Sequence, residues 1–359
     1  MTTAPFLSLH ALHSLPAGCL NRDRDGAINT IPMGGTTRIR ISSRALRRAM
    51  REHMRTRAID GGAFGIRTTR LPLEVVDRVD PSVGDRDQVI ARVAALFTAI
   101  GIKTNDKTGG TKVMLFVGPD AADRIATVVS ENFEQITAKK VPDHICDAAI
   151  AALDVDNVVD VALFGRFLSE ISSKTIAGAV NAAHAFSVHP AGIEADFWTA
   201  VDDLRSDGDP ASSNLGWMDL AAPVVYRYIA LDRRTLAHNL RAAPDTVPAA
   251  AEHALAEAFI HALPTGRRTS TAATTLPEFV VAVESGRDTS MANAFTRAIT
   301  DPDALTAATN SLFGTIERSQ RWLPDATVRV LPITADPTSL PVPQGWTVVD
   351  DIDALVGRR

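Results

Sequence analysis

Cysteine is scarce in this 359-residue sequence, which contains only Cys19 and Cys146. The two residues form no C-x-x-C pair and no plausible disulfide framework, which fits a reducing cytoplasm. The sequence has no stretch of about 18 apolar residues, and its start lacks the basic region and unbroken apolar run of a signal peptide. These absences predict a cytoplasmic protein that does not span or bind a membrane.

The common catalytic and metal-binding motifs are absent as well. There is no H-E-x-x-H, no G-x-S-x-G and no Walker A loop, because "TGGTK" (108–112) lacks the G-K-[ST] order. The spacing of Asp202, Asp203, Asp207 and Asp209 does not match a calcium loop. The sequence therefore predicts no catalytic residue, no metal site and no cofactor.

One short segment is strongly basic, although the formal net charge of the chain is −5. Residues 38–51, "RIRISSRALRRAMR", contain no acid and six arginines: Arg38, Arg40, Arg44, Arg47, Arg48 and Arg51. The first four residues alternate as in a strand, and the two serines are typical N-cap residues of a helix. The four arginines of that helix fall within an arc of about 100°, opposite Leu46, Ala49 and Met50.

An arginine surface without acidic partners favours a polyanionic ligand. Solvated helix faces usually mix charges, because like charges at i,i+4 are destabilising. Guanidinium groups are well suited to phosphate oxygens. The segment therefore predicts contact with a phosphate backbone, and a solvated face is the alternative for the helix taken alone.

The order of the expected elements indicates an α+β fold with two insertions. Strands are expected at 6–12, 38–41, 112–117, 158–167, 224–231, 278–284 and 327–333, and helices at 86–100, 119–133, 173–186 and 247–262. Residues 57–155 are mainly helical, and the turn-rich residues 187–222 suggest a long hairpin. A β-α-β core that continues after each of these insertions indicates a ferredoxin-like or RRM-like sandwich.

Eight segments carry a resemblance to a known family. They are "CLNRD" (19–23), "GGTTRIRISSRALRRAMR" (34–51), "DVALFGRF" (160–167), "AHAFSVH" (183–189), "DFWTAVDDL" (196–204), "LG" (215–216), "VVYRYI" (224–229) and "SMANAF" (290–295). In this order they resemble the CasC family, the repeating backbone subunits of Cascade, the type I-E CRISPR surveillance complex. The match spans nearly the whole chain and is weakest in the helical block.

The resemblance implies a hand-shaped subunit of the RAMP superfamily. Its RRM-like palm would hold residues 1–56, 156–186 and 223–359, its helical fingers 57–155, and its β-hairpin thumb 187–222. Copies would stack head to tail along the crRNA spacer, kink it at regular intervals and present it for pairing with target DNA. The further partners implied are the large subunit, the small subunit and the subunits that bind the crRNA ends.

The resemblance also assigns residues to the nucleic acids. The crRNA groove would be lined by Arg22, Ser42, Arg44, Arg47, Arg48 and Arg51, to which the basic segment itself adds Arg38 and Arg40, and a second basic loop adds Arg267 and Arg268. Phe167 and Leu215 would flank the displaced base, unless Phe167 is a core residue and Leu215 only anchors the hairpin. Lys139 and Lys140 match a patch that attracts DNA in relatives, with a solvated face as the alternative.

Two positions depart from the family pattern. Asn29 occupies a place that usually carries a lysine, so the RNA contact there is in doubt. Arg44 stands where glutamine is common, which would add a phosphate contact.

We interpret the chain as a non-catalytic RNA-binding scaffold of a ribonucleoprotein complex in antiviral defence. The alternative is a metal-dependent ribonuclease or another phosphate-handling enzyme. It would need a nucleophile, a metal cluster or an acid–base pair near the arginines. Related backbone subunits of other CRISPR types cleave RNA with a thumb aspartate, so Asp202 and Asp203 are its candidates.

Overall fold

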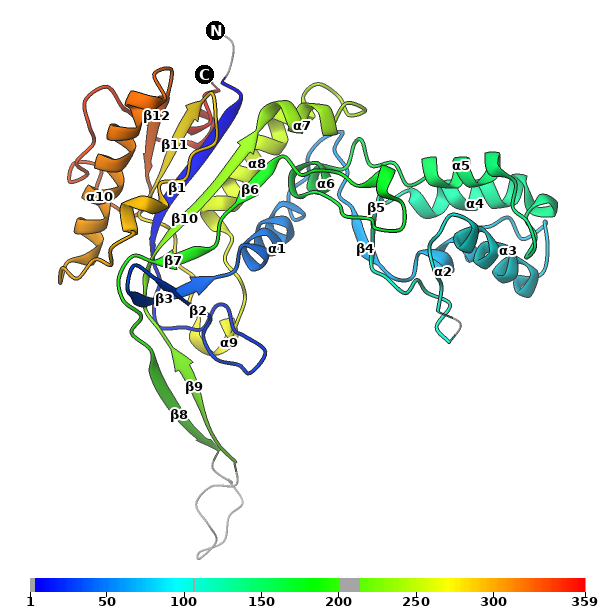
Figure 1. Cartoon of the computed structure of the whole chain (residues 1–359), viewed down its shortest axis with the longest axis horizontal. Coiled ribbons are helices and arrows are strands. Elements are labelled where there is room, and N and C mark those ends of the chain that lie inside the picture. Colours follow the sequence, from blue (N-terminus) through cyan, green and yellow to red (C-terminus); the bar gives the residue numbers. More distant parts are fainter. Residues whose placement is uncertain (1–3, 106, 201–213, 359) are drawn as a thin grey trace, which may run out of the picture. The chain divides into compact units, whose positions relative to one another are not determined.

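The computed structural model describes residues 4–105, 107–200 and 214–358 (Figure 1). The chain divides into two compact units. The first comprises Met1–Arg57, Asn181–Asp232 and Glu252–Arg359, and the second comprises Ala58–Val180 and Arg233–Ala251. Residues 156–180, which the resemblance placed in the palm, therefore cluster with the second unit.

A nine-stranded sheet forms the centre of the first unit, with the order β13-β12-β11-β1-β10-β7-β3-β2 and β6 paired to β10. Its strands are β1 (Phe6–Ser14), β2 (Thr30–Met33), β3 (Thr36–Ile41), β6 (Val180–Ala182), β7 (Ala185–Ser187), β10 (Val224–Asp232), β11 (Phe279–Ser285), β12 (Thr327–Pro332) and β13 (Thr347–Val348). The central strands are antiparallel, and Phe6 pairs with both Asp232 and Ser285. The expected strands that begin at residues 6, 38, 224, 278 and 327 are confirmed, and with them the α+β class.

Helices cover both faces of this sheet, which is why its central strands are buried on both sides (Figure 1). On one face, α10 (Ala304–Ser319) packs Leu312 and Phe313 into a cluster with Tyr226. On the other face, α1 (Ser43–Met54) packs Leu46 with Val225. Helix α8 (Val247–His261) also covers this face, where the buried Arg227 donates a hydrogen bond of 2.7 Å to the Phe259 carbonyl.

The second unit is mainly helical, as expected for its first hundred residues. Its elements are β4 (Ile66–Thr68), α2 (Leu71–Val76), α3 (Arg86–Ala99), β5 (Leu115–Val117), α4 (Ala121–Glu131), α5 (Asp143–Ala151), α6 (Val159–Phe164) and α7 (Arg233–Asn239), with 3₁₀ turns at Phe133–Gln135 and Ser172–Lys174. Leu96, Phe97, Ile125 and Ile145 belong to its buried core. The helices expected at 86–100 and 119–133 and a shorter form of the strand at 112–117 are confirmed.

Two expected elements are wrong. Residues 158–167 are not a strand but contain α6. Because this helix is buried on all sides, its sequence shows neither the alternation of a strand nor the one apolar face of an amphipathic helix, and its β-branched residues favoured a strand. Residues 173–186 are not a helix: after the 3₁₀ turn at 172–174 they form the short strands β6 and β7. Pairing of both strands with β10 overrides the helix propensity of their alanines.

The expected hairpin is present as β8 (Glu194–Ala200) and β9 (Asn214–Leu220), which pair only with each other among the described residues. The remaining short elements are α9 (Arg268–Thr271), α11 (Ile352–Leu355) and 3₁₀ turns at Ala292–Phe295 and Gln320–Trp322. In the part of the chain that the structure describes, no helix has the length and apolar character needed to cross a bilayer.

Candidate nucleic-acid interface

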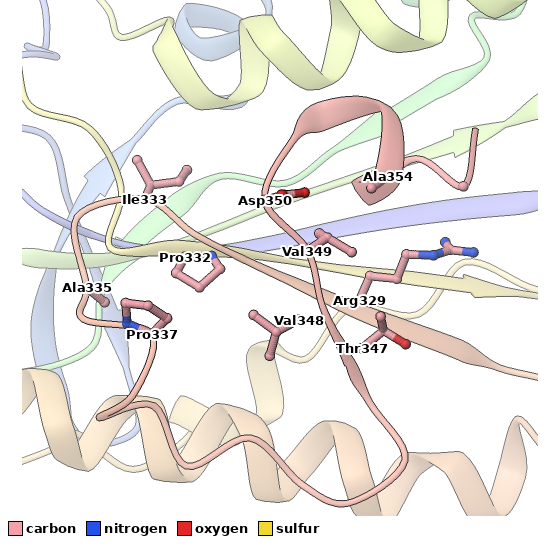
Figure 2. A pocket seen from close by; sticks show the side chains of 11 residues that line it. Arg329, Pro332, Ile333, Ala335, Pro337, Thr347, Val348, Val349, Asp350 and Ala354 are labelled. Atoms are coloured by element: carbon pink, nitrogen blue, oxygen red, sulfur yellow. The ribbon is translucent and has the colours of Figure 1, made fainter. Parts of the chain in front are cut away.

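A broad cleft of about 770 Å³ lies at the β12–β13 edge of the sheet (Figure 2). Arg329, Val348 and Asp350 lie along it, and the Arg329 guanidinium is ion-paired with Glu284 at 3.2 Å. Strands β2 and β3 lie at the opposite edge of the same sheet. The cleft is therefore separate from the basic segment.

The basic helix α1 begins where β3 ends, and its N-terminus is capped as expected. The Ser42 hydroxyl accepts a hydrogen bond of 3.3 Å from the Arg44 amide, and the Ser42 carbonyl accepts one of 3.0 Å from the Leu46 amide. The Ser42 amide in turn donates to Oδ1 of Asn21 at 2.8 Å. The N-terminal turn of α1 is thereby fixed to the 19–23 loop, which carries Arg22.

The four arginines of α1 differ in exposure. Arg44 and Arg48 are exposed, and Arg47 is half-buried. Arg48 donates from Nε to Glu52 at 2.7 Å, an exposed i,i+4 pair. Arg51, which the resemblance assigned to the RNA groove, is only 9% exposed.

Arg38 is fully buried, which contradicts its assignment to the RNA groove. Its two terminal nitrogens donate to the main-chain carbonyls of Ser187 at 2.8 Å and Phe295 at 3.1 Å. The alternating pattern of β3 is correct, but it predicts only which residues share a face. Whether another segment covers that face depends on the tertiary fold.

Arg40 is half-buried and is held by a set of polar side chains. Its Nη2 donates to Oδ1 of Asn29 at 3.0 Å, and its Nη1 lies 3.3 Å from Nδ1 of His184. Asn29 also donates from Nδ2 to Oδ1 of Asn21 at 3.0 Å. Asn29, for which the resemblance suggested a lysine, thus holds Arg40 in place. Sequence reasoning missed this role of Asn21 and His184, although both lie in the segments "CLNRD" and "AHAFSVH".

The 19–23 loop lies directly against the Gly266-Arg267-Arg268 loop. A Cβ atom on Gly266 would lie 2.4 Å from the Leu20 carbonyl oxygen, so only glycine allows this approach. Burial raises the pKa of the Cys19 thiol, while the charges of Arg22 and Arg267 lower it, which places both arginines near this thiol. The structure therefore brings two distant basic motifs together.

The backbone of the Arg267–Arg268 turn is strained. Arg267 has φ 53°, and Ala272, on the other side of α9, has φ 47°. Left-handed conformations are unfavourable for residues other than glycine and cluster at functional sites. Both arginines of the turn are exposed.

Phe167 and the two lysines lie in the second unit. Phe167 is 82% exposed, so the alternative of a core residue is wrong. Its neighbour Arg166 is buried and donates to the carbonyls of Leu153 at 2.8 Å and Lys174 at 3.0 Å, which fixes the backbone that presents Phe167. Lys139 and Lys140 are exposed in the turn before α5.

The β8–β9 hairpin exposes large apolar side chains. Phe197 pairs with Trp217, and Thr199 pairs with Leu215, so these four residues share one face. Phe197 is 59% exposed, Leu215 64% and Trp217 75%. On the opposite face, a Cβ on Gly216 would lie 2.6 Å from the Trp198 ring, which therefore packs closely over this glycine.

The described part of the chain contains no group of three or more His, Cys, Asp or Glu residues that could hold a metal ion. Asp202 and Asp203, the candidates for the enzyme alternative, lie outside the described residues.

Comparison with known proteins adds a family and two solved structures. Residues 7–344 match the family described as CT1975-like protein, and no curated protein matches the chain. A chain of a "CRISPR RNA-guided surveillance complex, pre-nicking" is 30% identical, with a TM-score of 0.85 over 98% of this chain and 99% of that one. A chain of a "CRISPR RNA-guided surveillance complex" is 25% identical, with a TM-score of 0.75 over 99% of this chain and 100% of that one.

Proposed function

Because the chain belongs to the CT1975-like protein family, we propose that it is a non-catalytic crRNA-binding backbone subunit of a type I-E Cascade complex. The similar solved structures belong to CRISPR RNA-guided surveillance complexes and cover nearly the whole chain, which supports a place in such a complex. Copies would stack head to tail along the crRNA spacer and present it for pairing with target DNA.

One feature of the first unit supports RNA binding above all. This unit exposes arginines on three separate segments, and hydrogen bonds and close packing join these segments. The exposed arginines are Arg22, Arg44, Arg48, Arg267 and Arg268. Guanidinium groups bind phosphate oxygens irrespective of base sequence. A carrier of variable guides needs this kind of contact, because base pairing then reads the target.

The exposed apolar side chains fit the bending of the RNA. A displaced nucleobase can stack or wedge against apolar side chains such as Phe167 and Leu215. The hairpin carries Leu215 together with Phe197 and Trp217, and a two-stranded hairpin with both faces exposed is marginal without a partner. We assign it the role of a thumb that closes over RNA held by the neighbouring copy.

Lys139 and Lys140 would contact target DNA, since both are exposed and lie on the unit that corresponds to the fingers. Lysines at such positions act as mobile positive charges that raise the rate of encounter with a polyanion. The large subunit, the small subunit and the subunits that bind the crRNA ends would complete the assembly.

The test is purification of the chain after co-expression with its genomic neighbours. We expect RNA to co-purify with the protein, so that absorbance at the nucleic-acid maximum is raised relative to the protein maximum. The RNA should run as one discrete length on a denaturing gel. A nucleic-acid-free complex would contradict the proposal. Cleavage of labelled RNA by the purified chain with a divalent metal, lost in Asp203→Ala, would favour the ribonuclease instead.

A further inference from the structure

His184 connects the first turn of α1 to Arg40. Its Nδ1 lies 3.2 Å from the main-chain nitrogen of Ser43 and 3.3 Å from Nη1 of Arg40. A backbone amide and a guanidinium can only donate hydrogen bonds. Nδ1 must therefore be the acceptor in both, which requires an unprotonated Nδ1 and places the ring proton on Nε2.

Arg40 is consequently held from two sides. Asn29 accepts from its Nη2 at 3.0 Å, and the Arg40 amide donates to the Asn29 carbonyl at 2.8 Å. His184 accepts on the other side. The side chain stays half-buried, with its guanidinium fixed beside the start of α1. A guanidinium held in place loses less conformational entropy when it binds a phosphate.

We propose that His184 is a positioning residue of the RNA groove, whose neutral imidazole accepts from the Ser43 amide and from Arg40 and so orients Arg40 and the N-terminal turn of α1 toward the RNA backbone. This inference rests on the proposed RNA-binding function and adds a condition to it: His184 acts as an acceptor and not as a positive charge.

The surroundings of His184 favour its neutral form. Partial burial lowers the pKa of its imidazole first of all, although the residue is exposed, and the positive charges of Arg40 on β3 and Arg44 on α1 lower it further. The adjacent strand β10 contributes Tyr228, whose pKa burial raises to about 12, so it is uncharged at neutral pH. Asp288, the acid that acts on Tyr228, accepts a hydrogen bond of 2.8 Å from Asn181.

Acidification should therefore weaken the arrangement. Because the folded-state pKa is lowered, the stabilisation by the neutral ring is complete above pH ~6.5, the pKa of histidine in the unfolded chain. It is lost as the pH falls through the lower pKa of the folded state. A protonated ring cannot accept from either donor, and it repels both arginines.

A double-mutant cycle tests whether His184 acts through Arg40. The full chain and its His184→Ala, Arg40→Ala and double variants are titrated with a fluorescently labelled oligouridine at fixed salt. We expect His184→Ala to weaken binding about three- to tenfold in the parent, the size of one ordinary hydrogen bond. It should have a clearly smaller effect in the Arg40→Ala background, where only the hydrogen bond from the Ser43 amide remains to be lost. Equal effects in both backgrounds would overturn the proposal.

A pH profile separates positioning from direct charge contact. In His184→Asn the amide oxygen takes the place of Nδ1 but cannot be protonated, so this variant should restore binding at neutral pH. As the pH is lowered from ~7.5 past the ordinary histidine value of ~6.5 and on through the lower pKa of folded His184, the affinity of the parent relative to His184→Asn should fall. The other histidines cancel in this ratio. A ratio that stays flat or rises would overturn the proposal, because a rise would make His184 a cationic contact.

Failure of the proposed function gives a different result. If the parent itself bound oligouridine without salt dependence, the RNA groove would be wrong as a whole. Salt-dependent binding by the parent with no coupling between His184 and Arg40 would remove only this inference.

Discussion

Nη1 of Arg38 lies 2.8 Å from the main-chain carbonyl oxygen of Ser187, and both residues are fully buried. Nη2 reaches the carbonyl of Phe295 at 3.1 Å. One arginine of the basic segment thus joins β3, β7 and the 3₁₀ turn at Ala292–Phe295. Its hydrogen bonds stabilise the fold, whereas the side chains of Arg44 and Arg48 are exposed.

Replacing Arg38 should therefore destabilise the protein. Arg38→Ala leaves two carbonyl groups without their donor inside the protein, so we expect the free energy of unfolding to fall by about 2–4 kcal/mol. Denaturant unfolding followed by circular dichroism measures this change. Arg48→Ala is the matched control, because its ion pair is exposed and should change stability by less than ~1 kcal/mol. Equal stability of the two variants would contradict the structural role.

The difference between these arginines shows what the sequence could predict. Alternation and N-cap chemistry located β3 and α1 correctly, since both depend on nearest neighbours. Burial of Arg38 depends on the carbonyl of Phe295, far away in the sequence, and no local pattern reports such a contact. The same limit explains β6 and β7, which pair with the distant strand β10. The polar side chains around Arg40 come from separate loops, so the sequence did not predict their contact with it either.

The exposed arginines of α1 should act through their charge. We expect the double variant Arg44→Ala, Arg48→Ala to bind unrelated single-stranded RNAs more weakly by a similar factor. The slope of log affinity against log salt should fall by about 0.7 for each phosphate that the variant no longer neutralises. Arg318→Ala with Arg321→Ala is the control, since it removes the same charge elsewhere in the first unit, away from α1. Weakening confined to one RNA sequence would mean base recognition instead.

Lys139 and Lys140 should matter after the guide is loaded. Replacing both with Glu should leave the amount of co-purified RNA unchanged and slow the capture of target duplex, most clearly at low salt, where screening is weak. Stopped-flow or surface-binding kinetics of the assembled complex measure this rate. Lys103→Glu with Lys112→Glu controls for the same charge change at other exposed positions of the second unit. If the Lys139/Lys140 variant captured duplex at the parent rate, these lysines would form a solvated face.

His10 should make the fold sensitive to acid. Burial lowers the pKa of its imidazole to about 3, and Nδ1 lies 2.9 Å from the Tyr226 hydroxyl. Because the folded-state pKa lies below that of the unfolded chain, the stabilisation is complete above pH ~6.5 and is lost as the pH falls toward about 3. Each pKa unit corresponds to about 1.4 kcal/mol. Urea unfolding at several pH values should show a smaller acid loss in His10→Asn than in the parent, and parallel curves would contradict the buried neutral ring.

The hairpin should be required for assembly and not for folding of the first unit. Leu215, Trp217 and Phe197 are exposed on one face, and strands β8 and β9 pair only with each other among the described residues. Replacing Leu215 and Trp217 with Ser therefore leaves the buried core intact. We expect unchanged thermal unfolding and unchanged binding of short RNA, but a loss of regular stacking along the guide, because a heterologous interface needs both of its surfaces.

Trp322→Ser is the matched control for this variant. Trp322 is 85% exposed in the same unit, near the end of the sheet at which β12 begins, so its replacement removes a similar apolar surface away from the hairpin. Negative-stain microscopy of co-expressed complexes should show full-length assemblies for Trp322→Ser and short or irregular ones for the hairpin variant. Chemical probing of the bound RNA should also lose its periodic reactivity only in the hairpin variant, because the displaced base is then no longer supported by Leu215. Normal assemblies with periodic reactivity in the hairpin variant would remove the thumb from the mechanism.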